Sequence, residues 1–263
     1  MLTPLNEIVI KKYLQEDIFL NIVESISSTN DYFKGKPRLD EFEFCFAEHQ
    51  TQGRGRLGRS WHSPAGQNLM LSCRWSLPEN LKTKSLQGLS SCISLSLLSA
   101  LQYLNIPDLK CKWPNDLFYQ DKKLAGILIE LYSLQGQITE AIIGIGMNVN
   151  MPEDTPSALS IEKPWTSLQH ILGKSQERNK LAAQVIQHLT TYLTRFAEKG
   201  WTDFIAEWNQ YDYLTGKEVS MVIDNKNVNG TARGVDLSGS LLIETPHEGI
   251  ITCSSGEIKI LPG

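Results

Sequence analysis

The spacing of apolar residues predicts three strands near the start of the chain. A mostly apolar run at Ile18–Ile26 predicts one strand, and Asn68–Trp75 predicts another. Between them, Phe42, Phe44 and Phe46 alternate with other residues, which is the period of two that is typical of a half-buried strand. The early part of the chain therefore predicts a sheet.

Helical spacing follows in two long segments and two short ones. A set of apolar residues recurs at steps of three and four, which places them on one helical face: Leu86, Leu89, Ile93, Leu97, Leu101 and Leu104. The same spacing over Leu181–Phe196 predicts a second long helix that ends at Gly200. Shorter helices are predicted from about Asp31, after the capping residues Ser27–Asn30, and over Phe204–Trp208.

Between the long helices, three β-like runs are predicted at Lys110–Tyr119, Leu124–Leu131 and Ile138–Asn148. After Thr215-Gly216 the pattern changes to short strands separated by turn residues such as Asp224-Asn225. Five strands are predicted there: Glu218–Ile223, Val228–Arg233, Ser240–Glu244, Ile250–Cys253 and Glu257–Leu261. This pattern predicts a small barrel, so we divide the chain into residues 1–214 and 215–263.

Composition narrows the class of protein. The chain has 263 residues, 41% hydrophobic residues and a formal net charge of −4, which suits a globular protein and argues against a general nucleic-acid binder. Five scattered cysteines without a CxxC pair favour reduced thiols over a disulfide framework. No signal peptide, membrane-spanning run or His/Cys zinc pattern is present, so we expect a cytoplasmic protein without a structural metal.

The most informative segment is Gln50–Trp61, where three glycines and three arginines lie within the seven positions Gly53–Arg59. Glycine allows close backbone approach to a ligand, and arginine offers fixed donors for phosphate or carboxylate. The pattern therefore favours an anion clamp, although a solvated surface loop has the same composition. It also matches G-x-G-x-x-G, but the Trp, Pro and Gly residues that follow it favour a loop over the helix of a dinucleotide fold.

Three further segments carry weaker signals. In Lys112–Asp116 a proline interrupts a predicted strand, and a lysine, an asparagine and an aspartate lie close to it in sequence. Asp116 could bind a metal ion that bridges nucleotide phosphates, or it could orient Lys112. Lys123–Glu130 begins with a lysine at the mouth of an apolar strand, and Gly144–Asn150 ends a buried strand with two glycines. A plain turn explains the first segment equally well, and hairpin-tip charges are the commoner explanation of the second. The third misses the dinucleotide fingerprint, because Val149 stands where the third glycine belongs.

Taken in order, Ser28-Thr29-Asn30, GRGRLGRSW, KWPND, KLAGILIE and GIGMNVN resemble a biotin–protein ligase. The later GVDLSGSLLIE and SSGEIKI resemble the small C-terminal domain of that family. The resemblance implies an α+β fold: a class II synthetase-like mixed sheet with helices, followed by an SH3-like β-barrel domain. It also implies that biotin and MgATP form biotinyl-5′-adenylate, from which a lysine of a biotin carboxyl carrier protein then takes the biotin.

The resemblance also implies roles for residues at matching positions. Expected to act in catalysis are Lys123 and Arg56. Expected to bind biotin are Ser28, Thr29, Asn30, Gln50, Gly53, Arg54, Arg56, Lys123 and Gly126. Expected to bind the nucleotide are Arg54, Arg59, Trp61, Lys112, Asn115, Asp116 and Asn148. ATP, Mg²⁺ and biotin are the small molecules implied, and no metal-ligand set on the protein is expected.

Two departures from the family pattern bear on function. Some members carry an arginine where Leu57 stands, so the loop here has less charge. Larger members begin with a DNA-binding domain, whereas 27 residues precede Ser28 here, so we expect a ligase without DNA binding or repression. Family members are monomers or homodimers. One alternative is a lipoate–protein ligase, and the pairing of the GRGR and KWPND motifs argues against it. The other is a non-catalytic nucleic-acid module, and the acidic net charge argues against that.

Overall fold

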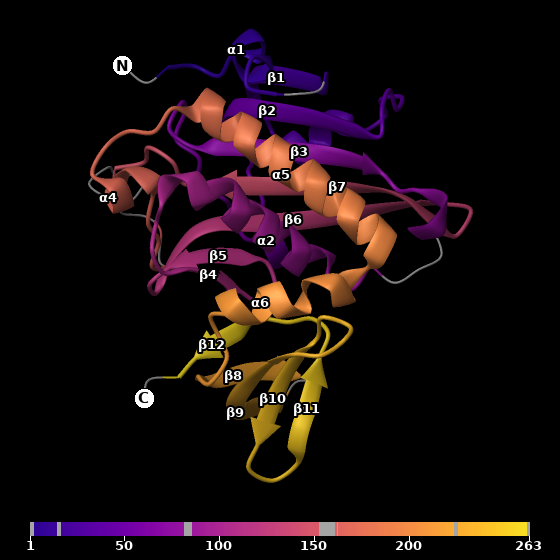
Figure 1. The fold of residues 1–263 in the computed structure, drawn as a ribbon, viewed down its shortest axis with the longest axis vertical. Helices are drawn as coiled ribbons and strands as arrows, with labels where there is room; N and C mark the ends of the chain where they lie inside the picture. The colour runs from indigo at the N-terminus through magenta and orange to yellow at the C-terminus, as the bar shows by residue number, and fades with distance from the viewer. Residues whose placement is uncertain are drawn as a thin grey trace.

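Two sheets of different size organise the chain. The computed structural model describes residues 3–14, 17–81, 86–152, 161, 163–223 and 226–261, and the turn predicted at Asp224-Asn225 lies outside them. A seven-stranded mixed sheet is followed in sequence by a five-stranded antiparallel sheet at the C-terminal end of the molecule (Figure 1). The α+β class and the small all-β C-terminal unit expected from the sequence are therefore confirmed.

The large sheet has the strand order β1-β2-β3-β7-β6-β5-β4. Its strands are β1 (Phe19–Ile26), β2 (Phe42–Gln50), β3 (Leu69–Ser76), β4 (Leu109–Lys112), β5 (Asp116–Tyr119), β6 (Lys122–Leu134) and β7 (Gln137–Met147). Only the pair β1–β2 is parallel among the paired strands of this sheet in the described chain. The run predicted at Lys110–Tyr119 is two strands, because Pro114 has no N–H with which to continue the ladder, and the turn there contains a cis Trp113–Pro114 bond.

Helices cover one face of this sheet. The described helices are α1 (Glu7–Lys11), α2 (Leu89–Leu101), α4 (Leu168–Leu172), α5 (Arg178–Lys199) and α6 (Ile205–Tyr211), with short 3₁₀ turns η1 (Thr29–Phe33), η2 (Arg56–Gly58), η3 (Glu79–Leu81), η4 (Gln102–Leu104) and η5 (Trp201–Phe204). Helices α2 and α5 pack against one another in front of the sheet (Figure 1). Both long helices were predicted; the short one near Asp31 is the 3₁₀ turn η1.

Alternation along β2 divides its side chains between two clusters. Phe44 and Phe46 belong to the main core beneath α2 and α5, whereas Cys45 packs with Phe33 and Ile142 on the opposite face. Because neighbouring residues of a strand point to opposite faces, η1 covers the face that the long helices leave open. That second face is where the candidate site lies.

The small sheet docks tightly on the large domain. It contains β8 (Glu218–Ile223), β9 (Lys226–Val235), β10 (Leu241–Thr245), β11 (Gly249–Cys253) and β12 (Ile258–Ile260), in the order β11-β10-β9-β8-β12. Trp113 Nε1 donates a hydrogen bond of 3.1 Å to Gly239 O in the β9–β10 turn. A Cβ on Gly239 would fall 2.8 Å from Gly88 Cα, so this turn and the start of α2 need two glycines.

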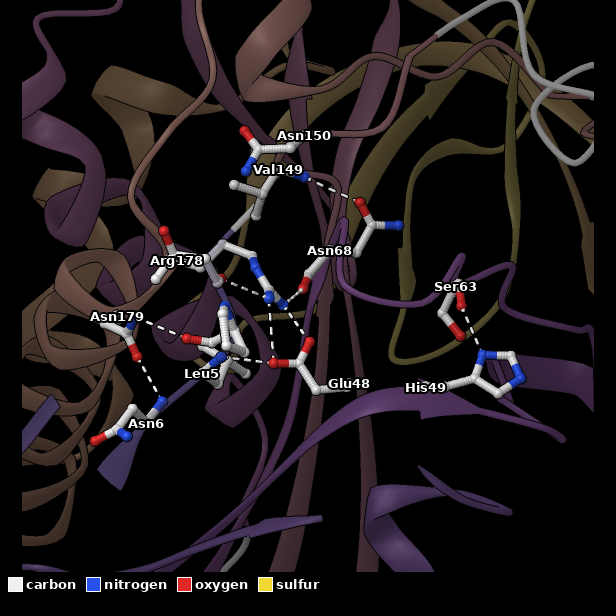
Figure 2. A network of polar contacts seen from close by, with 12 residues as sticks. Leu5, Asn6, Glu48, His49, Ser63, Asn68, Val149, Asn150, Arg178 and Asn179 are labelled. Carbon is white, nitrogen blue, oxygen red and sulfur yellow. Dashed lines mark hydrogen bonds and ion pairs between the residues drawn. The ribbon is translucent and has the colours of Figure 1, made fainter. Parts of the chain in front are cut away.

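A buried polar network ties the N-terminal segment to the sheet (Figure 2). The guanidinium of Arg178, which is 2% exposed, donates to both oxygens of Glu48 at 2.8 and 3.1 Å and to Thr3 O at 3.0 Å. Leu5 N donates to the same carboxylate at 2.6 Å. Since Glu48 lies near the end of β2, the network holds the strand end from which the glycine–arginine segment emerges.

No helix of the described chain is long and apolar enough to cross a membrane.

We predict that Glu48→Ala lowers the free energy of unfolding by about 3 kcal/mol, because it leaves the buried Arg178 charge without a carboxylate. Urea unfolding followed by circular dichroism measures this change. The matched control is Glu244→Ala, whose partner Arg233 is exposed; it should cost no more than about 1 kcal/mol. Equal losses in the two variants would show that burial of the Arg178 pair contributes nothing.

Candidate active site

The segment Gly53–Trp61 folds as a small hairpin. Trp61 N donates to Gly53 O at 2.9 Å and Gly55 N donates to Arg59 O at 2.7 Å. The tip is η2, where Leu57 has φ +56° and Gly58 has φ +72°. Residues 59–68 are described throughout and contain only turns and extended backbone, so the match to the dinucleotide fingerprint opens no helix. We refer to this hairpin, residues 53–61, as the ligand loop.

A cavity that is partly open to solvent lies between the ligand loop and strands β6 and β7. Ten residues expected from the sequence line it: Ser28, Thr29, Asn30, Gln50, Arg54, Arg56, Trp61, Asn115, Lys123 and Gly126. Segments as far apart in the chain as η1 and β7 thus meet at one cavity.

The floor of the cavity is bare backbone. Gly126 of β6 pairs directly with Gly146 of β7, and Gly144 lies on the same face two residues earlier. A Cβ on Gly146 would fall 2.7 Å from Trp61 Cζ2, and one on Gly144 would overlap the Asn30 amide. Neither Gly144 nor Gly146 was among the expected site residues. Their signal was glycine at alternate positions of a buried strand.

One end of the cavity is a chain of hydrogen bonds between hydroxyl and amide groups that ends on a carboxylate. Gln50 Oε1 accepts from Thr29 N at 2.7 Å and from Thr29 Oγ1 at 3.1 Å. The hydroxyl of Ser72, in the middle of β3, lies 2.7 Å from Thr29 Oγ1 and 2.5 Å from Asn30 Oδ1. Asn30 Nδ2 donates to Glu130 Oε2 at 2.8 Å. Sequence reasoning missed Ser72 and the role of Glu130, because only the fold brings them to this end.

The opposite end carries cations. Lys123 Nζ forms an ion pair of 2.6 Å with Asp116 and lies 5.5 Å from the centre of a Trp61 ring. Arg56 Nη1 donates to Asn115 Oδ1 at 3.2 Å, and Asn115 is itself held by Ile127 O at 2.7 Å. Burial lowers the pKa of Arg56, although Asp116 opposes that shift. A partly desolvated cation beside a neutral amide favours an anionic ligand.

The other two loop arginines are paired with carboxylates. Arg54 binds both oxygens of Asp31, at 2.7 and 2.9 Å. Arg59 forms an ion pair with Glu257 of the small domain, and Lys163 lies 2.5 Å from the same carboxylate. Arg59 first and Lys163 second hold the pKa of Glu257 at about 2. The ligand loop is therefore fastened on both sides.

The remaining expected residues lie around the cavity, outside its lining. Gly53 allows the loop to close, because a Cβ there would fall 2.7 Å from Trp61 O. Lys112 lies 4.8 Å from the centre of the Phe118 ring, and burial lowers the pKa of its ammonium group. Asn148 is buried and donates to Thr166 O at 3.0 Å, which joins the end of β7 to the segment before α4.

Comparison with known proteins places the chain in a family. Residues 22–148 match the biotin/lipoate A/B protein ligase family, and residues 214–261 match the biotin protein ligase C-terminal domain. The chain is 36% identical over 241 residues to the bifunctional ligase/repressor BirA of Escherichia coli, covering 91% of this chain and 73% of that protein. It is 27% identical over 217 residues to the biotin–[acetyl-CoA-carboxylase] ligase of Mycobacterium tuberculosis, covering 81% and 76%.

Solved structures agree. The biotin protein ligase of Aquifex aeolicus, in complex with biotin and ATP, superposes with a TM-score of 0.79 at 29% identity and covers 93% of this chain and 99% of that one. The fold and cavity thus define a ligase of the biotin/lipoate class. The chain belongs to the biotin protein ligase family. The resemblance of its ordered motifs to that family is confirmed, and the C-terminal match argues against the lipoate alternative.

We predict that Gly144→Ala leaves the fold intact but lowers kcat/KM for biotin roughly 100-fold, because the new Cβ displaces Asn30 and with it one wall of the cavity. Steady-state kinetics with biotin as the varied substrate measure the loss, and thermal unfolding checks the fold. Unchanged kinetics in a folded variant would show that Asn30 moves aside without consequence for the site.

Proposed function

We propose that this chain joins biotin to ATP and then transfers the biotin to a lysine of a biotin carboxyl carrier protein. The observation that supports it most strongly is the cavity itself. A neutral hydrogen-bonding end, a glycine floor and a cationic end follow one another beneath a single loop. A ligand with a polar ring, an apolar chain and a carboxylate next to a phosphate has the same order of groups.

In the binding proposal, the ureido ring of biotin meets Ser28, Thr29, Asn30 and Gln50. These groups offer hydroxyl and amide donors and acceptors, and they are already aligned by Ser72 and Glu130. Interactions that are formed before the ligand arrives cost less to use than groups that must be ordered on binding. The apolar chain of biotin then lies over Gly126, which directs the carboxylate to Lys123.

For the nucleotide we propose the cationic end, with Arg56, Asn115, Trp61 and Lys112 near it. Trp61 Nε1 is buried and has no hydrogen-bond partner within the described residues, so a donor is available next to the floor. Arg59 and Asn148 are proposed as outer contacts. Mg²⁺ is proposed to arrive on the ATP phosphates, since such an ion needs only one or two protein carboxylates, and Asp116 is one in the right place.

The first step forms a mixed anhydride. A carboxylate oxygen of biotin attacks the α-phosphorus of ATP, the bond from that phosphorus to the bridging oxygen breaks, and pyrophosphate leaves. Two anions must approach one another for this, so Lys123 and Arg56 are proposed to neutralise the charge that gathers on phosphorus. Their side chains line the same cavity, where partial exclusion of water strengthens such interactions.

The second step transfers the acyl group. An uncharged lysine amine of the carrier attacks the biotinyl carbon, the bond to the phosphate oxygen breaks, AMP leaves, and the nitrogen loses a proton. The carrier must reach the partly open side of the cavity, so we propose that the ligand loop covers the intermediate until the carrier docks.

We further propose that the division near residue 214 separates a catalytic part from a small domain that supports the nucleotide end. Trp113 of the KWPND motif contacts Gly239 of the small domain, and Glu257 reaches the ligand loop. The five cysteines are buried and unpaired, which favours a reducing compartment, and we propose a cytoplasmic location on that ground. The oligomeric state, monomer or homodimer, stays open.

The proposed function predicts exchange of pyrophosphate into ATP that requires biotin. Labelled pyrophosphate incorporation is measured with biotin, with lipoate and with neither. Biotin alone should support exchange, and an apo biotin carboxyl carrier domain should then become labelled with biotin while a lipoyl domain should not. Exchange with lipoate, or none with biotin, would contradict the proposal.

A second prediction concerns Lys123. Lys123→Ala should lower biotin-dependent exchange at least 100-fold without changing the fold, because the cation facing the reacting anions is lost. The matched control is Lys122→Ala, the preceding residue of β6, which is not among the residues that line the cavity. It should keep near-normal exchange. A Lys123→Ala variant with near-normal exchange would show that Lys123 has no part in the reaction.

A further inference from the structure

One loop arginine is occupied by the protein itself. Arg54 presents two nitrogens to the two oxygens of Asp31, at 2.7 and 2.9 Å, and its Nη2 lies 3.7 Å from Glu130 Oε1. This two-pronged geometry is the strongest form of an arginine–carboxylate contact. An anionic ligand that bound Arg54 would have to displace a carboxylate first.

Asp31 is well placed to hold that arginine. It lies in η1 directly after Ser28, Thr29 and Asn30, the residues of the polar end. Ser27 Oγ donates to it at 3.2 Å and Lys34 Nζ lies 2.5 Å away. Arg54 first, and then Lys34, hold the pKa of Asp31 far below its usual range, which favours the charged form that binds Arg54.

Arg56 differs from Arg54 in this respect. Its guanidinium donates to the neutral amide of Asn115, and its charge is half-buried. A desolvated cation without a directly bound carboxylate gains most from an arriving anion. Arg54 and Arg56 are two residues apart in the ligand loop, yet Arg54 binds a carboxylate and Arg56 binds a neutral amide.

We propose that Asp31 is a positioning residue that fastens the ligand loop through Arg54. Arg56 is then the loop arginine that faces the ligand. This proposal rests on the proposed function. The contact joins the loop to the 3₁₀ turn that carries the polar end of the cavity. Arg54 also approaches Glu130, the carboxylate that orients Asn30, so that loop closure and the geometry of that end are linked. Closure slows escape of the acyl-adenylate and keeps it from water.

The test uses Asp31→Asn, Arg54→Gln and their double variant in the full-length protein. Preformed biotinyl-5′-adenylate is isolated on each protein, and its dissociation rate is measured by rapid filtration. We expect at least tenfold faster release in each single variant, a higher KM for biotin with a smaller change in kcat, and no further loss in the double variant. Asp31→Glu, which keeps the carboxylate, should restore much of the retention.

The matched control is Lys34→Gln, because Lys34 shares the Asp31 carboxylate but does not belong to the loop. It should release the adenylate within twofold of the wild-type rate. Losses that multiply in the Asp31/Arg54 double variant, or faster release in Arg54→Gln but not in Asp31→Asn, would overturn the proposal and give Arg54 a direct contact with the ligand.

A ligand-free measurement separates this proposal from the function. Limited trypsin digestion at Arg56 and Arg59 should be faster in Asp31→Asn than in the wild type or in Lys34→Gln. Wild-type protein without biotin-dependent exchange would refute the proposed function, while the digestion would still decide whether Asp31 fastens the loop. Equal digestion of all three proteins would refute the fastening.

Discussion

The site depends on the close approach of side chains to bare backbone on strands β6 and β7. Gly126 and Gly146 face one another across the ladder, and the Trp61 ring lies where a Cβ on Gly146 would project. Any side chain there would push the ligand loop away from the sheet. The glycines of β6 and β7 therefore determine how closely the ligand loop approaches the sheet. Because the loop carries its arginines with it, they also determine where those cations lie.

Charge in this site is local and balanced. The chain as a whole is acidic, with a net charge of −4, yet it gathers lysines and arginines around one cavity. Carboxylates hold most of them: Asp116 binds Lys123, Asp31 binds Arg54, and Glu257 binds Arg59. Buried cations without such partners would weaken the fold, and cations fully neutralised would bind anions poorly. Arg56, which has an amide as its hydrogen-bond partner, lies between these limits.

Much of the architecture was predictable because it follows from local periodicity. The long helices, β2, β3 and the five strands of the small sheet all have clear spacing, and turn-forming residues separate most of them. The motif residues that line the cavity were also predictable, because a resemblance carries positions directly. What stayed hidden were partners chosen by the fold. Ser72 lies 43 residues from Thr29, and Glu257 lies 198 residues from Arg59, so no local pattern joins them.

The segment Lys112–Asp116 also has a structural role that no local sequence pattern predicts. Trp113 stands among residues that were expected to serve a nucleotide, but its indole is buried and its N–H is used by Gly239 of the small domain. A tryptophan in that position fills the junction between the domains, while the neighbouring Asn115 lines the cavity and Asp116 pairs with Lys123. The break at Pro114 makes this division possible, because it ends β4 and lets β5 begin with a new direction. One short segment thus positions the reacting end of the cavity and fixes the small domain that supplies Glu257 to the ligand loop.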